Sequence, residues 1–153
     1  MDETKTGSAQ AFQAKLQEVV DAIGVKTLPV DLDLLKEYCR LTGHDFAHCQ
    51  ARDLLPTGFL MTFTSPIFSE MFLAFFVKLP KLIKGVIHTA SQVEFFGPLR
   101  LGAGPYREKL AIRNLEEKSG KKGNYWAVDF EVSLMDPEDR KIVSDVHQFF
   151  LRV

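Results

Sequence analysis

A single carboxylate in an apolar stretch is the first candidate for chemistry. Residues 59–77 form a run of 19 positions in which Glu70 is the only side chain with a formal charge. A lone carboxylate is costly to bury, so one held in such a run is a candidate general base. The alternative is an exposed helix position, or an ion pair with an arginine or a lysine. Both interpretations of Glu70 are open from the sequence.

Imidazole and thiol groups gather between residues 39 and 49. His44 and His48 are four positions apart, as on one face of a helix, and Cys39 and Cys49 lie close by. These are the ligand types of a zinc site, but no second paired motif accompanies them, so we expect no metal. The alternative is a set of ordinary polar loop residues, with Asp45 capping a turn.

Two further histidines, His88 and His147, fall in segments with the alternation of β-strands. A histidine on a strand is more often a hydrogen-bonded part of the sheet than a catalyst, and we interpret both in that way. The segment 102–104 (Gly-Ala-Gly) has no helix pattern after it, so it is a turn and not a nucleotide-binding loop.

Composition indicates one globular domain. The chain has 153 residues, of which 46% are hydrophobic and 25% charged, and its 19 basic and 20 acidic residues leave a net charge of -1. That balance gives little attraction for a phosphate backbone or an anionic membrane. Two cysteines are too few for a disulfide scaffold, and the polar start lacks a signal peptide, so we expect a cytoplasmic protein. The run 59–77 has the length of a membrane span, but its polar residues favour a buried core helix.

The spacing of apolar residues predicts helices first and strands afterwards. We expect an amphipathic helix from about Ser8 to Ile23, a short helix capped by Asp31 or Asp33 and ending at Gly43, a loop over 44–57, and the core helix. Alternating segments then predict four long antiparallel strands over 86–96, 106–115, 126–134 and 142–153. The apolar face of the short helix is expected to be Leu34, Leu35, Tyr38 and Leu41. This order makes the fold class α+β, with a long apolar helix wrapped by a curved antiparallel sheet.

Three segments carry a resemblance to a known family. They are 38–43 (Tyr-Cys-Arg-Leu-Thr-Gly), 55–60 (Leu-Pro-Thr-Gly-Phe-Leu) and 88–95, which leads into 98–102 (Pro-Leu-Arg-Leu-Gly). With these segments the chain resembles the hot-dog fold of the MaoC-like acyl dehydratases, or (R)-specific enoyl-CoA hydratases, and most of all their N-terminal or partner-half subgroup. The resemblance covers residues 31–153, which we expect to form a single hot-dog domain, with 1–30 as an N-terminal helix and its connection.

The family's catalytic motif is broken in this chain. Active members carry Gly-Asp-x-Asn-Pro-x-His, but after Gly43 the aspartate position is His44 and the histidine position is Cys49. Asp45 and His48 are each one place out of register. If the loop is rearranged, they are the candidate acid and base for adding water to an enoyl thioester.

The resemblance also implies a tunnel for an acyl thioester of coenzyme A or acyl carrier protein beside the core helix. Its candidate binding residues are Gly58, Phe59, Met61, Phe72 and Arg100, where Arg100 and the basic turn 118–123 would contact phosphates. The aromatic and methionine stripe of the core helix would line the acyl pocket or simply pack the core.

These implications define one leading function and two alternatives. We expect hydration or dehydration of enoyl and 3-hydroxyacyl thioesters, without a cofactor, in a homodimer or in a heterodimer with another hot-dog subunit. The first alternative is a non-catalytic partner subunit or acyl-binding protein. The second is a hot-dog acyl-CoA thioesterase in which Glu70 is the catalytic carboxylate.

Overall fold

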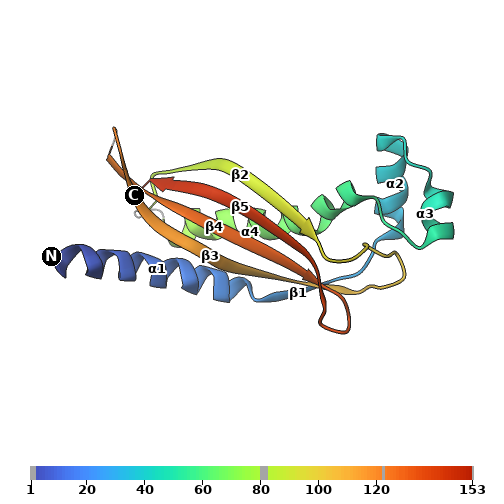
Figure 1. The fold of residues 1–153 in the computed structure, drawn as a ribbon, viewed down its shortest axis with the longest axis horizontal. Coiled ribbons are helices and arrows are strands. Elements are labelled where there is room, and N and C mark those ends of the chain that lie inside the picture. The colour runs from blue at the N-terminus through green and yellow to red at the C-terminus, as the bar shows by residue number, and fades with distance from the viewer. Residues whose placement is uncertain (1–2, 80–82, 122, 153) are drawn as a thin grey trace.

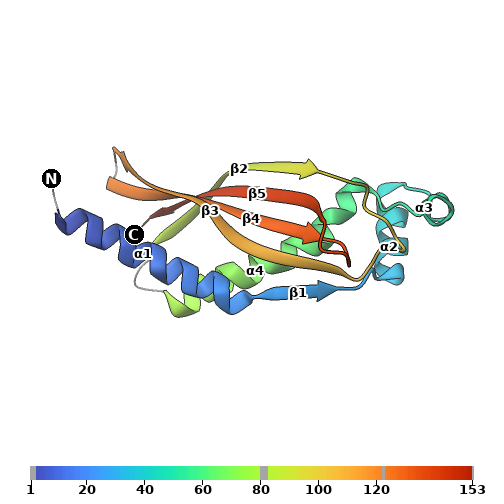
Figure 2. The same ribbon diagram turned by 60° about the horizontal axis from the view of Figure 1, so that its bottom comes forward.

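The computed structural model describes residues 3–79, 83–121 and 123–152, with side chains from residue 10 onward. Four α-helices and five strands follow one another in the order helix, strand, three helices, four strands. Figures 1 and 2 show helix α4 lying against one face of the twisted sheet, with helix α1 alongside strand β3. The α+β class and the central helix on an antiparallel sheet are as the sequence predicted.

Helix α1 (Glu3–Ile23) is part of the main core. It begins five residues before Ser8, where we expected it to start, so the predicted start of the helix was wrong. One face of the helix is buried among residues of α4 and the sheet, and the ring of Phe12 stacks on that of Trp126 with centroids 5.0 Å apart. The helix therefore packs against the sheet as an integral layer.

Helices α2 (Leu32–Thr42) and α3 (Phe46–Arg52) form a small unit at one end of the molecule (Figure 1). Asp31 caps α2 and Gly43 ends it in the left-handed conformation, as expected. The expected apolar face was wrong in part, because Leu34 and Leu41 are exposed. Helix α3 replaces much of the expected loop over 44–57.

Helix α4 (Met61–Lys78) follows a 3-10 turn (Thr57–Leu60) and fills the concave face of the sheet. The segment Thr57–Lys78 is long and apolar enough to cross a membrane by length and composition alone. Its face toward the sheet is buried, however, and includes Phe63, Ile67, Met71 and Phe75. Pro66 lies inside the helix. We conclude that α4 is a core helix, in agreement with the sequence.

The sheet has the strand order β1-β3-β4-β5-β2 and every neighbouring pair is antiparallel. Its long strands are β2 (Gly85–Phe95), β3 (Tyr106–Gly120), β4 (Gly123–Met135) and β5 (Lys141–Arg152). The short strand β1 (Val25–Leu28) was not expected, since four residues are too few to show alternation. A bulge between His88 and Ala90 moves the later residues of β2 to the opposite face. Simple alternation over 86–96, which would place Ile87 and Val93 on one face, is therefore interrupted.

Candidate functional site

Asp45 is the N-cap of helix α3. Its Oδ1 accepts hydrogen bonds from the backbone N–H groups of Ala47 (2.9 Å) and His48 (3.2 Å). The side chains of Asp45 and His48 are both exposed, and within the described residues no hydrogen bond joins the carboxylate to the imidazole ring. The structure thus gives Asp45 the capping role that was the alternative interpretation. A role for the two residues as an acid and base pair stays a proposal.

Glu70 forms an ion pair at the surface of α4. Its Oε2 lies 3.0 Å from the Nζ of Lys26 on strand β1, and the two side chains are 46% and 36% exposed. This is the lysine pairing that the sequence left open as the alternative to a buried base. Lys26 could not be singled out as the partner because it lies 44 residues away in the chain.

Beside this ion pair lies a buried carboxylate, Glu108 on strand β3, that the sequence reasoning missed. It is opposite Lys26 in the pairing of β1 with β3, its residue is 1% exposed, and its Oε2 has no hydrogen-bond partner. Burial raises the pKa of Glu108 to about 7, while the charge of Lys26 lowers it and that of Glu70 raises it. The signal was present in the alternation of β3, which puts Glu108 between Tyr106 and Leu110 on the buried face.

The predicted binding residues of the core helix are divided between interior and surface. Phe59 is buried and its ring packs edge-on against that of Tyr38 at 5.4 Å. A side chain at Gly58 would overlap the Tyr38 hydroxyl, so the tyrosine side chain would have to move to admit one. Met61 is exposed, whereas Phe72 is half-buried and its ring packs against that of Phe149 at 4.9 Å. Only Phe72 thus combines an accessible side chain with a wall of aromatic rings.

Arg100 lies at a pocket of about 330 Å³ beyond the end of strand β2. Arg140 and Lys141 bring two further cations to its lining, but both are paired with carboxylates, Arg140 with the buried Asp136 at 2.7 Å and Lys141 with Glu131 at 2.8 Å. The described contact of the Arg100 guanidinium with a carboxylate is a long one, 3.4 Å to Asp53. Lys122 of the basic turn lies outside the described residues. The Arg100 pocket is therefore one described place where a guanidinium with a long carboxylate contact could turn to an anionic group.

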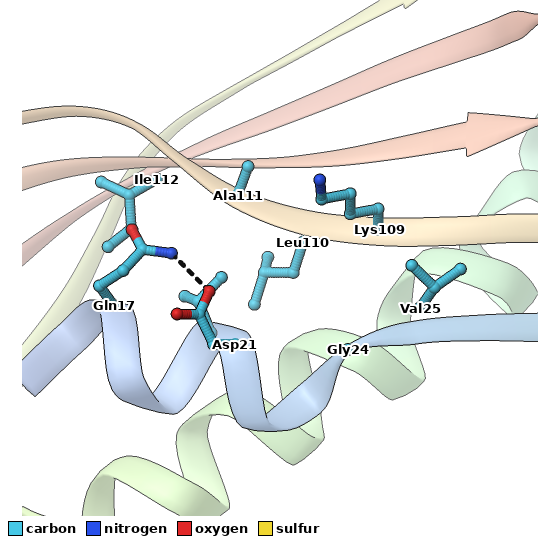
Figure 3. A pocket seen from close by; sticks show the side chains of 9 residues that line it. Gln17, Asp21, Gly24, Val25, Lys109, Leu110, Ala111 and Ile112 are labelled. Carbon is cyan, nitrogen blue, oxygen red and sulfur yellow. Dashed lines mark hydrogen bonds between the residues drawn. The ribbon is translucent and has the colours of Figure 1, made fainter.

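A groove of about 310 Å³ lies between the end of α1 and strand β3 (Figure 3). Gln17 and Asp21 face each other across one helical turn, and the Gln17 amide donates to the Asp21 carboxylate at 2.8 Å. None of the residues predicted for catalysis or binding lines this groove. We assign it no role in the chemistry.

Comparison with known proteins found similarity to this chain in structure, but not in sequence. Neither a protein-family model nor a curated protein matches the sequence. The solved HadBC (3R-hydroxyacyl-ACP dehydratase) complex of Mycobacterium tuberculosis matches with TM-score 0.57 and 16% identity, over 82% of this chain and 90% of that one. The ChsH1-ChsH2 complex of the same organism matches at 0.56 and 14% identity, over 90% and 95%.

A third solved structure differs from these in length. HtdX of Mycobacterium tuberculosis matches with TM-score 0.56 and 20% identity over 83% of this chain, but only 48% of the HtdX chain is covered. The chain described here therefore spans about half of HtdX. At these identities the three likenesses establish the fold.

Proposed function

We propose that this chain, which has the hot-dog fold, binds acyl thioesters of coenzyme A or acyl carrier protein and hydrates or dehydrates them together with a second hot-dog unit. The proposal extends the resemblance to the MaoC-like dehydratases from fold to activity. We further propose that the assembly is soluble and cytoplasmic.

The observation that carries this proposal is the open edge of strand β2. Among the described residues this strand is the last in the sheet and pairs with β5 alone, so one side of its backbone is unpaired there along Gly85–Phe95. Apolar side chains are exposed on it or just after it: Ile87, Val93, Phe95 and Phe96. A long, apolar edge strand is a template for another chain, and isolated proteins usually protect such an edge. HadBC and ChsH1-ChsH2, two proteins of similar fold, are complexes.

The aromatic wall on the core side of the sheet supports an acyl ligand. Phe68 and Phe72 of α4 lie next to Phe149 of β5, at ring separations of 6.2 and 4.9 Å. Apolar rings of this kind line pockets for apolar chains, while the Arg100 pocket offers cations for the phosphates of the carrier. HadBC, whose name specifies a hydroxyacyl-ACP dehydratase, has the same fold.

Association of two hot-dog units through the edge of β2 is tested by introducing a charged side chain at that edge. We expect Ile87→Lys to weaken self-association at least about tenfold, because it places repelling ammonium groups where two edges would meet. Ile87 is 65% exposed, so the substitution leaves the monomer intact. Sedimentation equilibrium measures the effect, with Leu41→Lys on α2 as a control of similar exposure. If the parent protein is a monomer, the second unit is a different hot-dog chain.

The role of Asp45 is tested by comparing two substitutions. Asparagine caps helices as well as aspartate does, so Asp45→Asn should keep the stability of the parent, while Asp45→Ala should lose about 1 kcal/mol in urea unfolding. A catalytic carboxylate would lose hydratase activity in both variants, and a cap would keep it in Asp45→Asn. The variant His48→Ala removes no helix cap, so a loss of hydratase activity in this variant would indicate a catalytic role for His48.

The activity itself is tested with the purified protein and trans-2-enoyl-CoA substrates of several chain lengths. Enoyl absorbance and free thiol are followed in the same sample. Loss of absorbance without thiol supports hydration, whereas release of thiol would make the protein a thioesterase and return attention to Glu70. If neither changes, the protein is a non-catalytic partner subunit.

A further inference from the structure

Two polar residues interrupt the apolar core face of strand β5. The face toward α4 carries Val143, Asp145, His147, Phe149 and Leu151 in alternation. Asp145 is fully buried, and the side chain of His147 is 13% exposed. A charged group in such a row is costly to bury unless it is paired or has a function. Neighbouring strand β2 (Figures 1 and 2) adds a third polar group, His88.

The three side chains form a series of neighbouring polar groups that runs from the core to the surface. Asp145 Oδ1 lies 2.8 Å from His147 Nε2, and His147 Nδ1 lies 3.1 Å from His88 Nε2. The two imidazole rings stack with centroids 5.0 Å apart. His88 is exposed, so this series of polar groups ends at solvent beside the open edge of β2. Both histidines are hydrogen-bonded within the sheet, as expected. Their hydrogen bond joins them to each other, and the Asp145 carboxylate lies next to His147.

The surroundings of Asp145 give it no other cation. Neither of its oxygens accepts a well-directed hydrogen bond, and the His147 N–H, although close, is not aimed at the oxygen. Its cross-strand neighbours are Val132 and Val93, and those of His147 are Phe130 and Ser91. Phe68 covers His147 from α4 at a ring separation of 4.3 Å. Among the described residues, the titratable groups at this place are therefore the two histidines and Asp145.

A further unpaired polar atom lies on the helix that covers this face. Thr64, one turn before Phe68 on α4, is fully buried and its hydroxyl has no hydrogen-bond partner. Buried polar atoms are nearly always paired in folded proteins, so the Thr64 hydroxyl on α4 and the Asp145 carboxylate on β5 are both exceptions to that rule.

We propose that His88, His147 and Asp145 form a proton relay that serves the thioester chemistry in place of the missing loop motif. The inference rests on the proposed function. The Nδ1 atom of His88 is the ring nitrogen not used toward His147, and it takes the proton from water as the water oxygen bonds to C3 of the enoyl thioester. The C2–C3 π electrons move to C2 and the thioester carbonyl. The His88 Nε2 proton can pass to His147 Nδ1, so that the positive charge comes to rest facing Asp145.

The same relay closes the reaction without a co-reactant. Return of the proton from His88 to C2 restores the neutral relay and leaves a 3-hydroxyacyl thioester, so the sum is the addition of one water. Dehydration is the reverse. His88 would be the proton-transfer residue, whereas His147 and Asp145 position and stabilise it. The acyl chain would lie against the accessible side of Phe72, whose ring packs on that of Phe149 beside the relay.

Steady-state kinetics with trans-2-enoyl-CoA test the relay if the protein is active. We expect His88→Gln to lower kcat about 100-fold, and Asp145→Asn about tenfold, because the first removes the proton-transfer group and the second a group that positions it. His44→Gln, at an exposed histidine outside the relay, is the matched control. Full activity in His88→Gln would overturn the relay.

Nitrogen NMR of the histidine rings tests the relay independently of activity. In the relay, Asp145→Asn must change the ring-nitrogen shifts of His88, which the carboxylate reaches only through His147. Ser144→Ala, a neighbouring substitution on the other face of β5, should leave them unchanged. Unchanged His88 shifts in Asp145→Asn would refute the relay. An inactive parent protein whose His88 shifts do respond would contradict the proposed function and leave the relay intact.

Discussion

Replacing the buried Glu108 with glutamine is expected to stabilise the protein at alkaline pH by up to about 3 kcal/mol. The pKa of this carboxyl rises from 4.5 to about 7 on folding, chiefly through burial. Below pH 4.5 both the folded and the unfolded chain hold the proton, and the full stability is present. Between pH 4.5 and 7 only the folded chain holds it, so stability falls by about 1.4 kcal/mol for each pH unit. Above pH 7 the loss is complete.

Glutamine has the shape of the protonated acid and does not titrate, so the variant escapes this loss. Urea unfolding at pH 4, 6 and 8 measures the difference, which should be small at pH 4 and largest at pH 8. Glu116→Gln, on the exposed part of the same strand, is the control and should follow the parent at every pH. A Glu108→Gln protein that is less stable than the parent at pH 8 would show that the ionised carboxylate is held by the fold.

Leu16→Ala is expected to destabilise the protein by about 2 to 5 kcal/mol, although it lies in a helix outside the segment that resembles the hot-dog family. Leu16 is 0% exposed and belongs to the core cluster that includes Phe75, Val128 and Phe130. Removing its side chain leaves a cavity between α1, α4 and the sheet. Because the core is closely packed, its neighbours can fill this cavity only if all three elements move.

Thermal and urea unfolding measure this loss, and the neighbouring exposed Lys15→Ala controls for the change in helix propensity. A loss below about 0.5 kcal/mol would mean that α1 can detach while the remaining domain keeps its stability. The expected large loss would mean that α1 and the sheet share one cooperative core.

The candidate residues of the loop and of the core helix have structural contacts, and the buried ionisable groups lie elsewhere. The loop that resembles a catalytic motif holds Asp45 as a helix cap, and the core helix holds Glu70 in a surface ion pair. The buried ionisable groups lie instead on strands: Glu108 on β3 and Asp145 and His147 on β5. The sheet is therefore the place to look for the chemistry of this protein.

The amino-acid sequence by itself determined the fold class, the core helix and the four long strands. Local periodicity predicts these features. An apolar residue every three or four positions forms one face of a helix, and an apolar residue at every second position forms one face of a strand. The ends of α2 were predictable for the same reason, because Asp31 and Gly43 act on backbone groups within a few residues.

Only the tertiary structure decided which polar groups meet. His88 and His147 are 59 residues apart, and the bulge in β2 after His88 sets which side chains follow it on the core face. Lys26 and Glu70 are joined across 44 residues by a strand too short to be seen in the sequence. Strand register and packing between distant segments leave no local pattern, and a register shift of one residue would turn Lys26, His88 or His147 to the other face of the sheet.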